Sequence, residues 1–274
     1  MTRIERRFAD LAARGRTGLI PFFTAGDPSV EAVVPVMHAL AEAGADLIEL
    51  GVPFSDPRAD GPVIQHASER ALAKGMGIAR ILEHVREFRA RDATTPVVLM
   101  GYLNPVEIHG AARFGAEAAA AGVDGVLLVD CPVEEFAAAA PLREAGLTQI
   151  LLAAPTTTDA RLADVCAAAS GFLYYVSFAG ITGADRLSTG DVRERVAAIR
   201  RQASTPVAVG FGVRDAASAA AIGEFADAVV IGSALVERLA GAADAHEAAE
   251  RARAFLAPIR TALDVNRSPA RMPV

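Results

Sequence analysis

The sequence is poor in the residues that cross-link small proteins or bind soft metals. Its 274 residues include two cysteines and no tryptophan. Cys131 and Cys166 lie in separate segments, without a CxxC or HxxxH spacing nearby. A disulfide framework or a zinc site is therefore not indicated. Two isolated cysteines fit a reducing compartment, so we expect a cytoplasmic protein.

Long hydrophobic runs and an excess of basic residues are also missing. No segment offers about 18 uninterrupted apolar residues, the length that would span a membrane. The first residues, MTRIERRFADLAARG, are charged and amphipathic and do not read as an export signal. Thirty-three acidic and 27 basic residues give a formal charge of −6 without a basic stripe. We therefore expect a protein that binds neither membranes nor nucleic acids.

Eight short apolar runs alternate with alanine-rich amphipathic segments, and this alternation predicts the fold class. Strands that alternate with crossover helices are typical of an α/β protein, and eight of them suffice for a closed (β/α)8 TIM barrel. An open doubly wound sheet is the alternative, because alternation alone does not prove closure. The runs are GLIPFF (18–23), DLIEL (46–50), PVVLM (96–100), VDGVLLV (123–129), TQILLA (148–153), GFLYYV (171–176), PVAVG (206–210) and ADAVVI (226–231).

The predicted barrel accounts for nearly the whole chain. No linker rich in Pro, Ser or charge divides the sequence, so residues 1–260 are expected to form one catalytic domain. An extra helix over about residues 2–14 precedes the first strand, and residues 62–90 are long enough for two helices separated at LAKGMG. Residues 261–274 are expected to form a loosely ordered tail.

Glycine-marked turns follow the last three predicted strands, where the active site of a barrel gathers. They contain Thr182-Gly183, then Gly212, and finally Gly232-Ser233. Glycine allows backbone N–H groups to approach an anion closely, and barrel phosphate sites are frequently built from the loops after the seventh and eighth strands. One such turn alone would mean little, but the three together predict a phosphorylated ligand. The segment GITGAD is not a P-loop, because it lacks the Gly-Lys-Ser/Thr ending.

One predicted strand carries a carboxylate. Side chains alternate along a strand, so Glu49 should face the barrel interior with Leu47 if Ile48 and Leu50 face the helices. Apolar surroundings would raise the pKa of Glu49 toward the range in which a carboxyl group both donates and accepts a proton. Pairing with an arginine or with backbone N–H groups is the alternative.

A second carboxylate follows in the loop GVPFSDPRADGP. Asp60 is a candidate for the same site, but it could instead stabilise a rigid turn, and spacing alone does not separate it from Asp56. The chain has one lysine, Lys74, away from the strand ends, and five histidines scattered over helix-like segments. Neither Schiff-base nor metal chemistry is indicated. A site with carboxylates as its only strong acid/base groups needs either an easy proton transfer or a substrate that supplies its own electron sink.

Seven motifs follow one another along the chain: LIPFFTAGDPS, ADLIELGVPFSDPRADGPVIQ, MGYLNP, GVDGVLLVDCPVEE, FLYYVSFAGITGA, VGFGV and GSALV. In this order, they resemble the tryptophan synthase α subunit family from about residue 1 to about 257. The resemblance implies a barrel that cleaves indole-3-glycerol phosphate to indole and glyceraldehyde 3-phosphate without a cofactor. Protonation of the indole ring at C3 makes the substrate its own electron sink.

The resemblance also implies roles for individual residues. Glu49 matches the general acid/base, and Asp60 matches the carboxylate that stabilises the positive indole N–H. Phe22, together with Leu99 or Met100, would line the indole pocket. The remaining matches are Tyr174 beside the catalytic acid, Thr182 as the residue that positions Asp60, and Gly183, Gly212, Gly232 and Ser233 as the phosphate cradle.

A partner is implied as well: a pyridoxal-phosphate β subunit that receives indole in an α2β2 complex and holds the cofactor that this chain lacks. An isomerase or indole-glycerol-phosphate synthase of the same barrel type is a rival, but such a synthase would need lysines at the strand ends. Two further alternatives stay open. One is a stand-alone lyase that releases indole, and the other is a non-catalytic barrel that binds a phosphorylated ligand and activates a partner.

Overall fold

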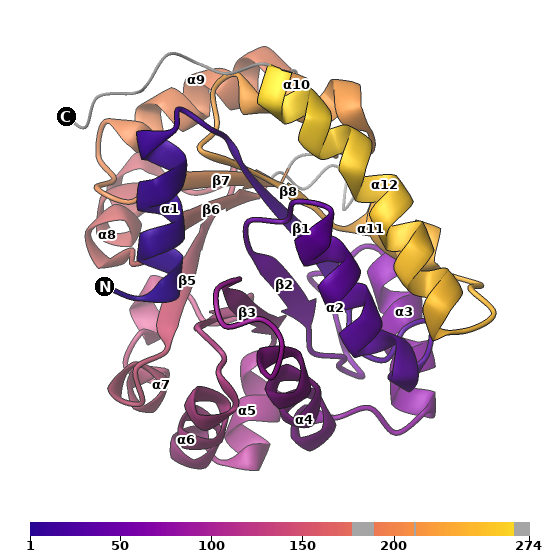
Figure 1. Ribbon diagram of the computed structural model, residues 1–274. Coiled ribbons are helices and arrows are strands. Elements are labelled where there is room, and N and C mark those ends of the chain that lie inside the picture. The colour runs from indigo at the N-terminus through magenta and orange to yellow at the C-terminus, as the bar shows by residue number, and fades with distance from the viewer. Residues whose placement is uncertain (177–188, 211, 266–274) are drawn as a thin grey trace.

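The computed structural model of the chain describes residues 1–176, 189–210 and 212–265. Within these ranges, eight parallel strands close into a barrel in chain order (Figure 1). The first strand pairs with both the second and the last, so the predicted TIM barrel is confirmed and the open sheet is wrong. The strands are β1 (Gly18–Thr24), β2 (Ile48–Gly51), β3 (Val97–Gly101), β4 (Gly125–Leu128), β5 (Thr148–Ala153), β6 (Leu173–Val176), β7 (Val207–Gly210) and β8 (Ala228–Ile231).

Helices surround the barrel as crossovers between neighbouring strands (Figure 1). The extra N-terminal helix and the pair of helices predicted within residues 62–90 are both present. The helices are α1 (Arg3–Ala13), α2 (Val33–Glu42), α3 (Pro62–Ala73), α4 (Ile78–Arg89), α5 (Leu103–His109), α6 (Ala111–Ala121), α7 (Ala140–Glu144), α8 (Asp159–Ala168), α9 (Thr189–Arg200), α10 (Ala216–Gly223), α11 (Ser233–Leu239) and α12 (Ala245–Val265), with short 3-10 turns η1 (Val30–Ala32) and η2 (Val133–Glu135).

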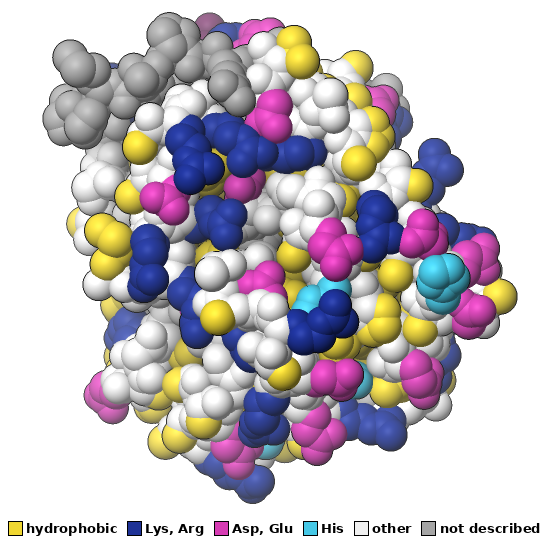
Figure 2. Space-filling model, in the orientation of Figure 1, with side chains coloured by type: hydrophobic (Ala, Val, Ile, Leu, Met, Phe, Trp, Pro, Cys, Tyr) yellow, Lys and Arg dark blue, Asp and Glu magenta, His cyan; other side chains and the backbone are white. Residues whose placement is uncertain are grey.

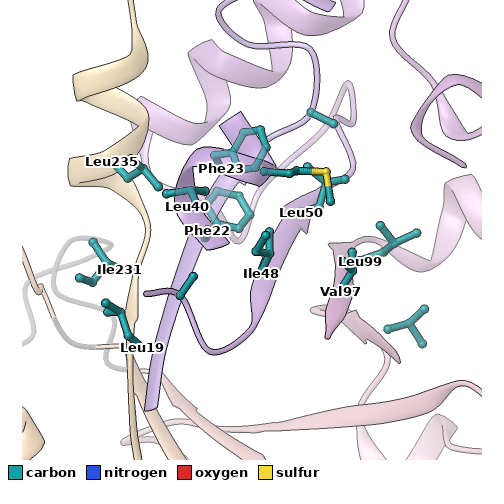
Figure 3. Packing of buried hydrophobic residues seen from close by; sticks show 14 of the residues in the cluster. Leu19, Phe22, Phe23, Leu40, Ile48, Leu50, Val97, Leu99, Ile231 and Leu235 are labelled. Atoms are coloured by element: carbon teal, nitrogen blue, oxygen red, sulfur yellow. The ribbon is translucent and has the colours of Figure 1, made fainter. Parts of the chain in front are cut away.

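The core has two parts, separated by the wall of the barrel. Leu47 and Val98 belong to a cluster inside the barrel. Ile48, Leu50 and Leu99 belong to the larger cluster that also contains side chains of the surrounding helices (Figure 3). This division follows from the alternation of side chains along each strand. The predicted orientation of β2, with Leu47 inward and Ile48 and Leu50 outward, is confirmed.

Helix α1 closes the N-terminal end of the barrel. Ile4, Phe8 and Leu11 on this helix are buried in the same cluster as the barrel interior. The side chain of Thr2 accepts a hydrogen bond from the Glu5 backbone in a capping box, which fixes the start of the helix. Because α1 fills this end with apolar side chains, the opposite end, where the strands terminate, is left for a binding site.

The C-terminal helix extends past the predicted domain boundary. Helix α12 continues to Val265, five residues beyond the expected end of the barrel at residue 260. Leu263 is buried, and Arg260 donates hydrogen bonds to Asp46 (3.0 Å) and Asp264 (2.8 Å). These contacts join residues 261–265 to the barrel, and residues 266–274 of the predicted tail lie outside the described residues.

Charged side chains of both signs are interspersed on the face shown in Figure 2. Ion pairs in the described part of the chain include Arg16 with Asp264 (2.6 Å) and Arg253 with Glu42 (2.6 Å). In the described part of the chain, no helix combines the length and the apolar character that crossing a lipid bilayer requires.

Candidate active site

A cavity of about 420 Å³ opens at the C-terminal ends of the strands, within the usual range for small-molecule sites. Side chains and backbone from β1, β2, β3, β5, β6, β7 and β8 surround it, together with the residue after β4, the loop before α3, the start of α3, the turn after β7 and the start of α11. Its lining includes Phe22, Glu49, Ala59, Asp60, Ile64, Met100, Val129, Leu152, Tyr174, Val176, Gly210, Gly212, Arg214, Val230, Gly232, Ser233 and Glu237. The cavity therefore joins turns from distant parts of the sequence.

Glu49 lies in the wall of this cavity with its carboxyl group out of water. Its side chain is 1% exposed, and in the described part of the chain it forms no hydrogen bond or ion pair. Burial raises the pKa of Glu49 to about 8, and the nearby charge of Asp60 adds to the effect. The alternative in which an arginine or backbone N–H groups satisfy Glu49 finds no support among these residues. At neutral pH the carboxyl group holds a proton that it can donate.

Glu49→Gln is expected to stabilise the fold at alkaline pH. The folded-state pKa of about 8 exceeds the ordinary value of 4.5, so the folded chain binds more protons than the unfolded chain between these pH values. Wild-type stability therefore falls as pH rises from about 5 to 8, by an amount on the order of a few kcal/mol. Glutamine does not titrate, so the stability of the Glu49→Gln variant lacks this contribution to the pH dependence. Urea unfolding of both proteins at pH 5 and pH 8.5 measures the difference, and an equal gap at the two pH values would contradict the prediction.

Asp60 is the second carboxylate of the cavity, and its position is fixed by neighbours. The hydroxyl of Tyr102 donates to Asp60 Oδ2 (3.0 Å) and accepts from the Ala59 N–H (3.0 Å). Gln65 Nε2 donates to the Asp60 carbonyl (2.8 Å). Burial raises the pKa of Asp60 to about 6, and the Tyr102 hydrogen bond partly opposes the rise. Asp60 is therefore largely ionised at pH 7, the opposite state to Glu49.

Asp56 does not share this environment. It is exposed, it accepts a hydrogen bond from the neighbouring Ser55 hydroxyl (3.2 Å), and it is not part of the cavity lining. The structure thus separates two carboxylates that spacing alone left equivalent, and Asp60 is the one at the cavity.

Tyr102 was not predicted as a site residue, although GYLNP marks the end of the third strand. Tyr102→Phe removes the hydrogen bond that favours ionised Asp60, so the pKa of Asp60 should rise. If catalysis needs ionised Asp60, the acid limb of the kcat/KM profile moves to higher pH. The variant then loses more kcat/KM, relative to wild type, at pH 6 than at pH 8. A pH profile measures this shift. Tyr175→Phe is the matched control, because Tyr175 packs in the outer cluster, and the same shift in both variants would contradict the role.

The apolar wall of the cavity matches the prediction in part. Phe22, Tyr174 and Met100 line it. Leu99 does not, because it points from β3 into the outer cluster, as Figure 3 shows; its neighbour Met100, the stated alternative, faces the cavity instead. Leu99 is therefore wrong as a pocket residue. Burial raises the pKa of Tyr174 well above its usual value, so its hydroxyl stays neutral.

Two glycines make room for the aromatic side chains. A Cβ atom on Gly51 would lie 2.7 Å from Phe22 Cζ, and one on Gly210 would lie 2.4 Å from Tyr174 Oη. A side chain at either position would therefore force the neighbouring ring to move. The two glycines leave the space that both rings occupy in the wall.

The glycine-marked end of the cavity contains Gly212, Gly232 and Ser233. Gly212 has φ = +53°, a conformation that favours glycine, and a Cβ atom added there would meet no described atom within 4 Å. The backbone is therefore open to an approaching group at this point. Thr182 and Gly183, the other predicted phosphate-side residues, lie outside the described residues.

The chain matches the family model described as "Tryptophan synthase alpha chain" over residues 8–263. The tryptophan synthase alpha chains of Xanthomonas axonopodis pv. citri (strain 306) and Xylella fastidiosa (strain 9a5c) are 62% and 61% identical to it, over 96% of this chain and 99% of each relative. Tryptophan synthase subunit alpha from Legionella pneumophila str. Paris has a TM-score of 0.90 at 41% identity, covering 97% of this chain and 99% of that one.

A tryptophan synthase structure from M. tuberculosis in its aminoacrylate-bound form has a TM-score of 0.84 at 36% identity, covering 96% of this chain and 100% of that one. The family model, the relatives and the solved structures each match this chain over nearly its full length. The chain therefore belongs to the tryptophan synthase alpha chain family, and it is a lyase that cleaves indole-3-glycerol phosphate in the alpha reaction of tryptophan biosynthesis.

Proposed function

We propose that Glu49 carries the proton transfers of this reaction. Its carboxyl group, protonated at neutral pH, donates its proton to C3 of the indole ring and so generates an indoleninium ion. The bond between C3 and the glycerol carbon then breaks, and its electron pair returns to the ring. The neighbouring hydroxyl group loses its proton to the Glu49 carboxylate as it becomes the aldehyde. Glu49 thus gives one proton, regains one, and ends the cycle unchanged.

Asp60 stabilises the positive charge that this protonation creates. The indole nitrogen becomes cationic when C3 is protonated, and an ionised carboxylate near the N–H favours that state. The pKa values of about 8 for Glu49 and about 6 for Asp60 place the two groups in opposite states near pH 7. Two carboxyl groups whose surroundings separate their pKa values commonly divide acid and electrostatic roles in this way. The proposal depends most on the buried, unpartnered Glu49 carboxyl at the cavity.

The rest of the cavity holds the substrate. Phe22, Met100 and Tyr174 pack against the indole ring and exclude water from the reacting carbons. Gly212, Gly232 and Ser233 supply backbone and hydroxyl donors for the phosphate group. Thr182, as the residue that positions Asp60, and Gly183, as part of the phosphate cradle, lie outside the described residues and stay predictions.

We also propose that the chain acts in the cytoplasm with a pyridoxal-phosphate β subunit, in an α2β2 complex, and that the partner holds the only cofactor. The loop at residues 53–56 beside the cavity would contribute to the contact. Phe54 of this loop packs on Tyr102 (5.1 Å between ring centroids), and helix α5, which follows Tyr102, leaves Ile108 79% exposed. This exposed isoleucine, on the helix that follows Tyr102, supports a protein contact at α5.

Indole release from indole-3-glycerol phosphate by the purified chain, with and without a β subunit, tests the assembly. Slow release that rises sharply with the partner supports the α2β2 assignment. Fast release by the chain alone, unchanged by the partner, would instead favour the stand-alone lyase. Sedimentation of the mixture is the independent check, since a true partner must co-sediment with this chain.

A further inference from the structure

The charge of the cavity raises a question about phosphate binding. Three acidic residues line it: Asp60, Glu237 and Glu49, of which Glu49 is protonated at neutral pH. Arg214 is the only basic residue among the described residues that line the cavity. A phosphate group brought among carboxylates needs a cation nearby, because like charges at short range oppose binding.

The backbone holds Arg214 at the glycine-marked end. Arg214 follows Gly212 by two residues, at the turn between β7 and α10. Its N–H donates to Ser218 Oγ (3.0 Å), and the Ser218 N–H donates to Asp215 Oδ1 (2.8 Å) in the capping box that starts α10. The position of Arg214 is thus fixed at its main chain.

The guanidinium group of Arg214, in contrast, is free to take a ligand. Its side chain is exposed, and it forms no hydrogen bond or ion pair with the residues that the structure describes. Neighbouring Asp215 accepts the hydrogen bonds of the helix cap; these bonds, and to a smaller extent the charge of Arg214, lower the pKa of Asp215, but the two side chains form no ion pair. Glu237, on α11, forms no ion pair with Arg214 in the described ranges either. An arginine without an ion pair, two residues after the open backbone at Gly212, is well suited to a phosphate, whose oxygens match the guanidinium fork.

We propose that Arg214 is a specificity-determining residue, which binds the phosphate group of indole-3-glycerol phosphate and draws the anionic substrate into an otherwise acidic cavity. The proposal rests on the phosphate position given under the proposed function. Arg214 lies away from the reacting carbons, so it contributes to substrate binding and selection and not to the chemical step.

The test compares Arg214→Gln with Arg238→Gln. Arg238 is an exposed arginine on α11 that lines, with Arg214, a neighbouring groove of about 600 Å³ but not the active-site cavity. At low salt, Arg214→Gln should raise KM about threefold to tenfold and leave kcat within about twofold, as expected for a lost charge-assisted contact. Competitive inhibition by inorganic phosphate should weaken by a similar factor. Arg238→Gln should leave both constants unchanged, and Arg214→Lys should recover part of the loss.

Salt dependence supplies a second readout. An electrostatic contact of an exposed arginine is screened, so the KM ratio between Arg214→Gln and wild type should shrink toward one as ionic strength approaches about 1 M. Equal KM values at low salt, a loss confined to kcat, or the same effect in Arg238→Gln would each overturn the proposal. These outcomes require an active wild-type enzyme, whereas a wild type that does not turn over indole-3-glycerol phosphate would instead overturn the proposed function.

Discussion

Glu49→Gln is expected to lower kcat for indole release by about a thousandfold, the middle of the range for loss of a general acid/base. Glutamine has nearly the shape of protonated glutamic acid, so the cavity and KM should change little. The variant cannot deliver a proton to C3 or accept one from the glycerol hydroxyl. Because Glu49 forms no hydrogen bond with the described residues, the substitution breaks no such contact, and the loss reports chemistry rather than misfolding.

The measurement is steady-state indole release by the wild type, Glu49→Gln and Glu83→Gln. Glu83 is exposed on α4, outside the barrel, so the same chemical change there should leave kcat unaltered. The wild-type kcat/KM should decline above pH about 8, where Glu49 loses its proton, and below pH about 6, where Asp60 gains one. A Glu49→Gln variant with more than about a tenth of wild-type kcat would contradict the acid/base role of Glu49, since general acid/base catalysis is usually worth more.

The orientation of β2 could be predicted from the sequence, whereas that of β3 could not. Glu49 is a polar residue in an apolar run, and it marks which face of β2 meets the substrate. The run PVVLM contains no polar residue, and a parallel strand covered on both faces shows no apolar-polar alternation. Nothing in the sequence decides whether Leu99 or Met100 faces inward. The barrel settles the choice through register, since Glu49 lies beside inward-facing Val98.

The supporting contacts of the site were also beyond prediction, because they join segments that meet only in the folded barrel. Tyr102 and Asp60 are 42 positions apart, and their hydrogen bond requires both the end of β3 and the loop after β2 to be in place. The same contact distinguishes Asp60 from Asp56. Strand alternation and glycine turns identify candidate groups from the sequence, but the pairing of a carboxylate with its neighbour depends on tertiary structure.

Asp60→Asn is expected to lower kcat/KM by about a hundredfold or more, the usual cost of removing one preorganised electrostatic contact from a transition state. Asparagine keeps an oxygen that can accept from the Tyr102 hydroxyl, so the loop geometry should persist while the negative charge disappears. Asp56→Asn, measured without a partner subunit, is the control in the same loop. Its carboxylate is exposed and outside the cavity lining, so kcat/KM should stay within about twofold of wild type.

The same substitution should also change the titration of Glu49. The charge of Asp60 is one cause of the raised pKa of Glu49, so its removal lets Glu49 ionise more readily, and the alkaline limb of the residual activity should move below pH about 8. Burial, the larger cause, remains and keeps the pKa above 4.5. Equal losses in Asp60→Asn and Asp56→Asn would show that the charge of the loop, and not Asp60 at the indole nitrogen, supports the reaction. If kcat/KM falls in Asp60→Asn but not in Asp56→Asn, and the alkaline limb of the pH profile moves, the two carboxyl groups must act on one substrate within one cavity.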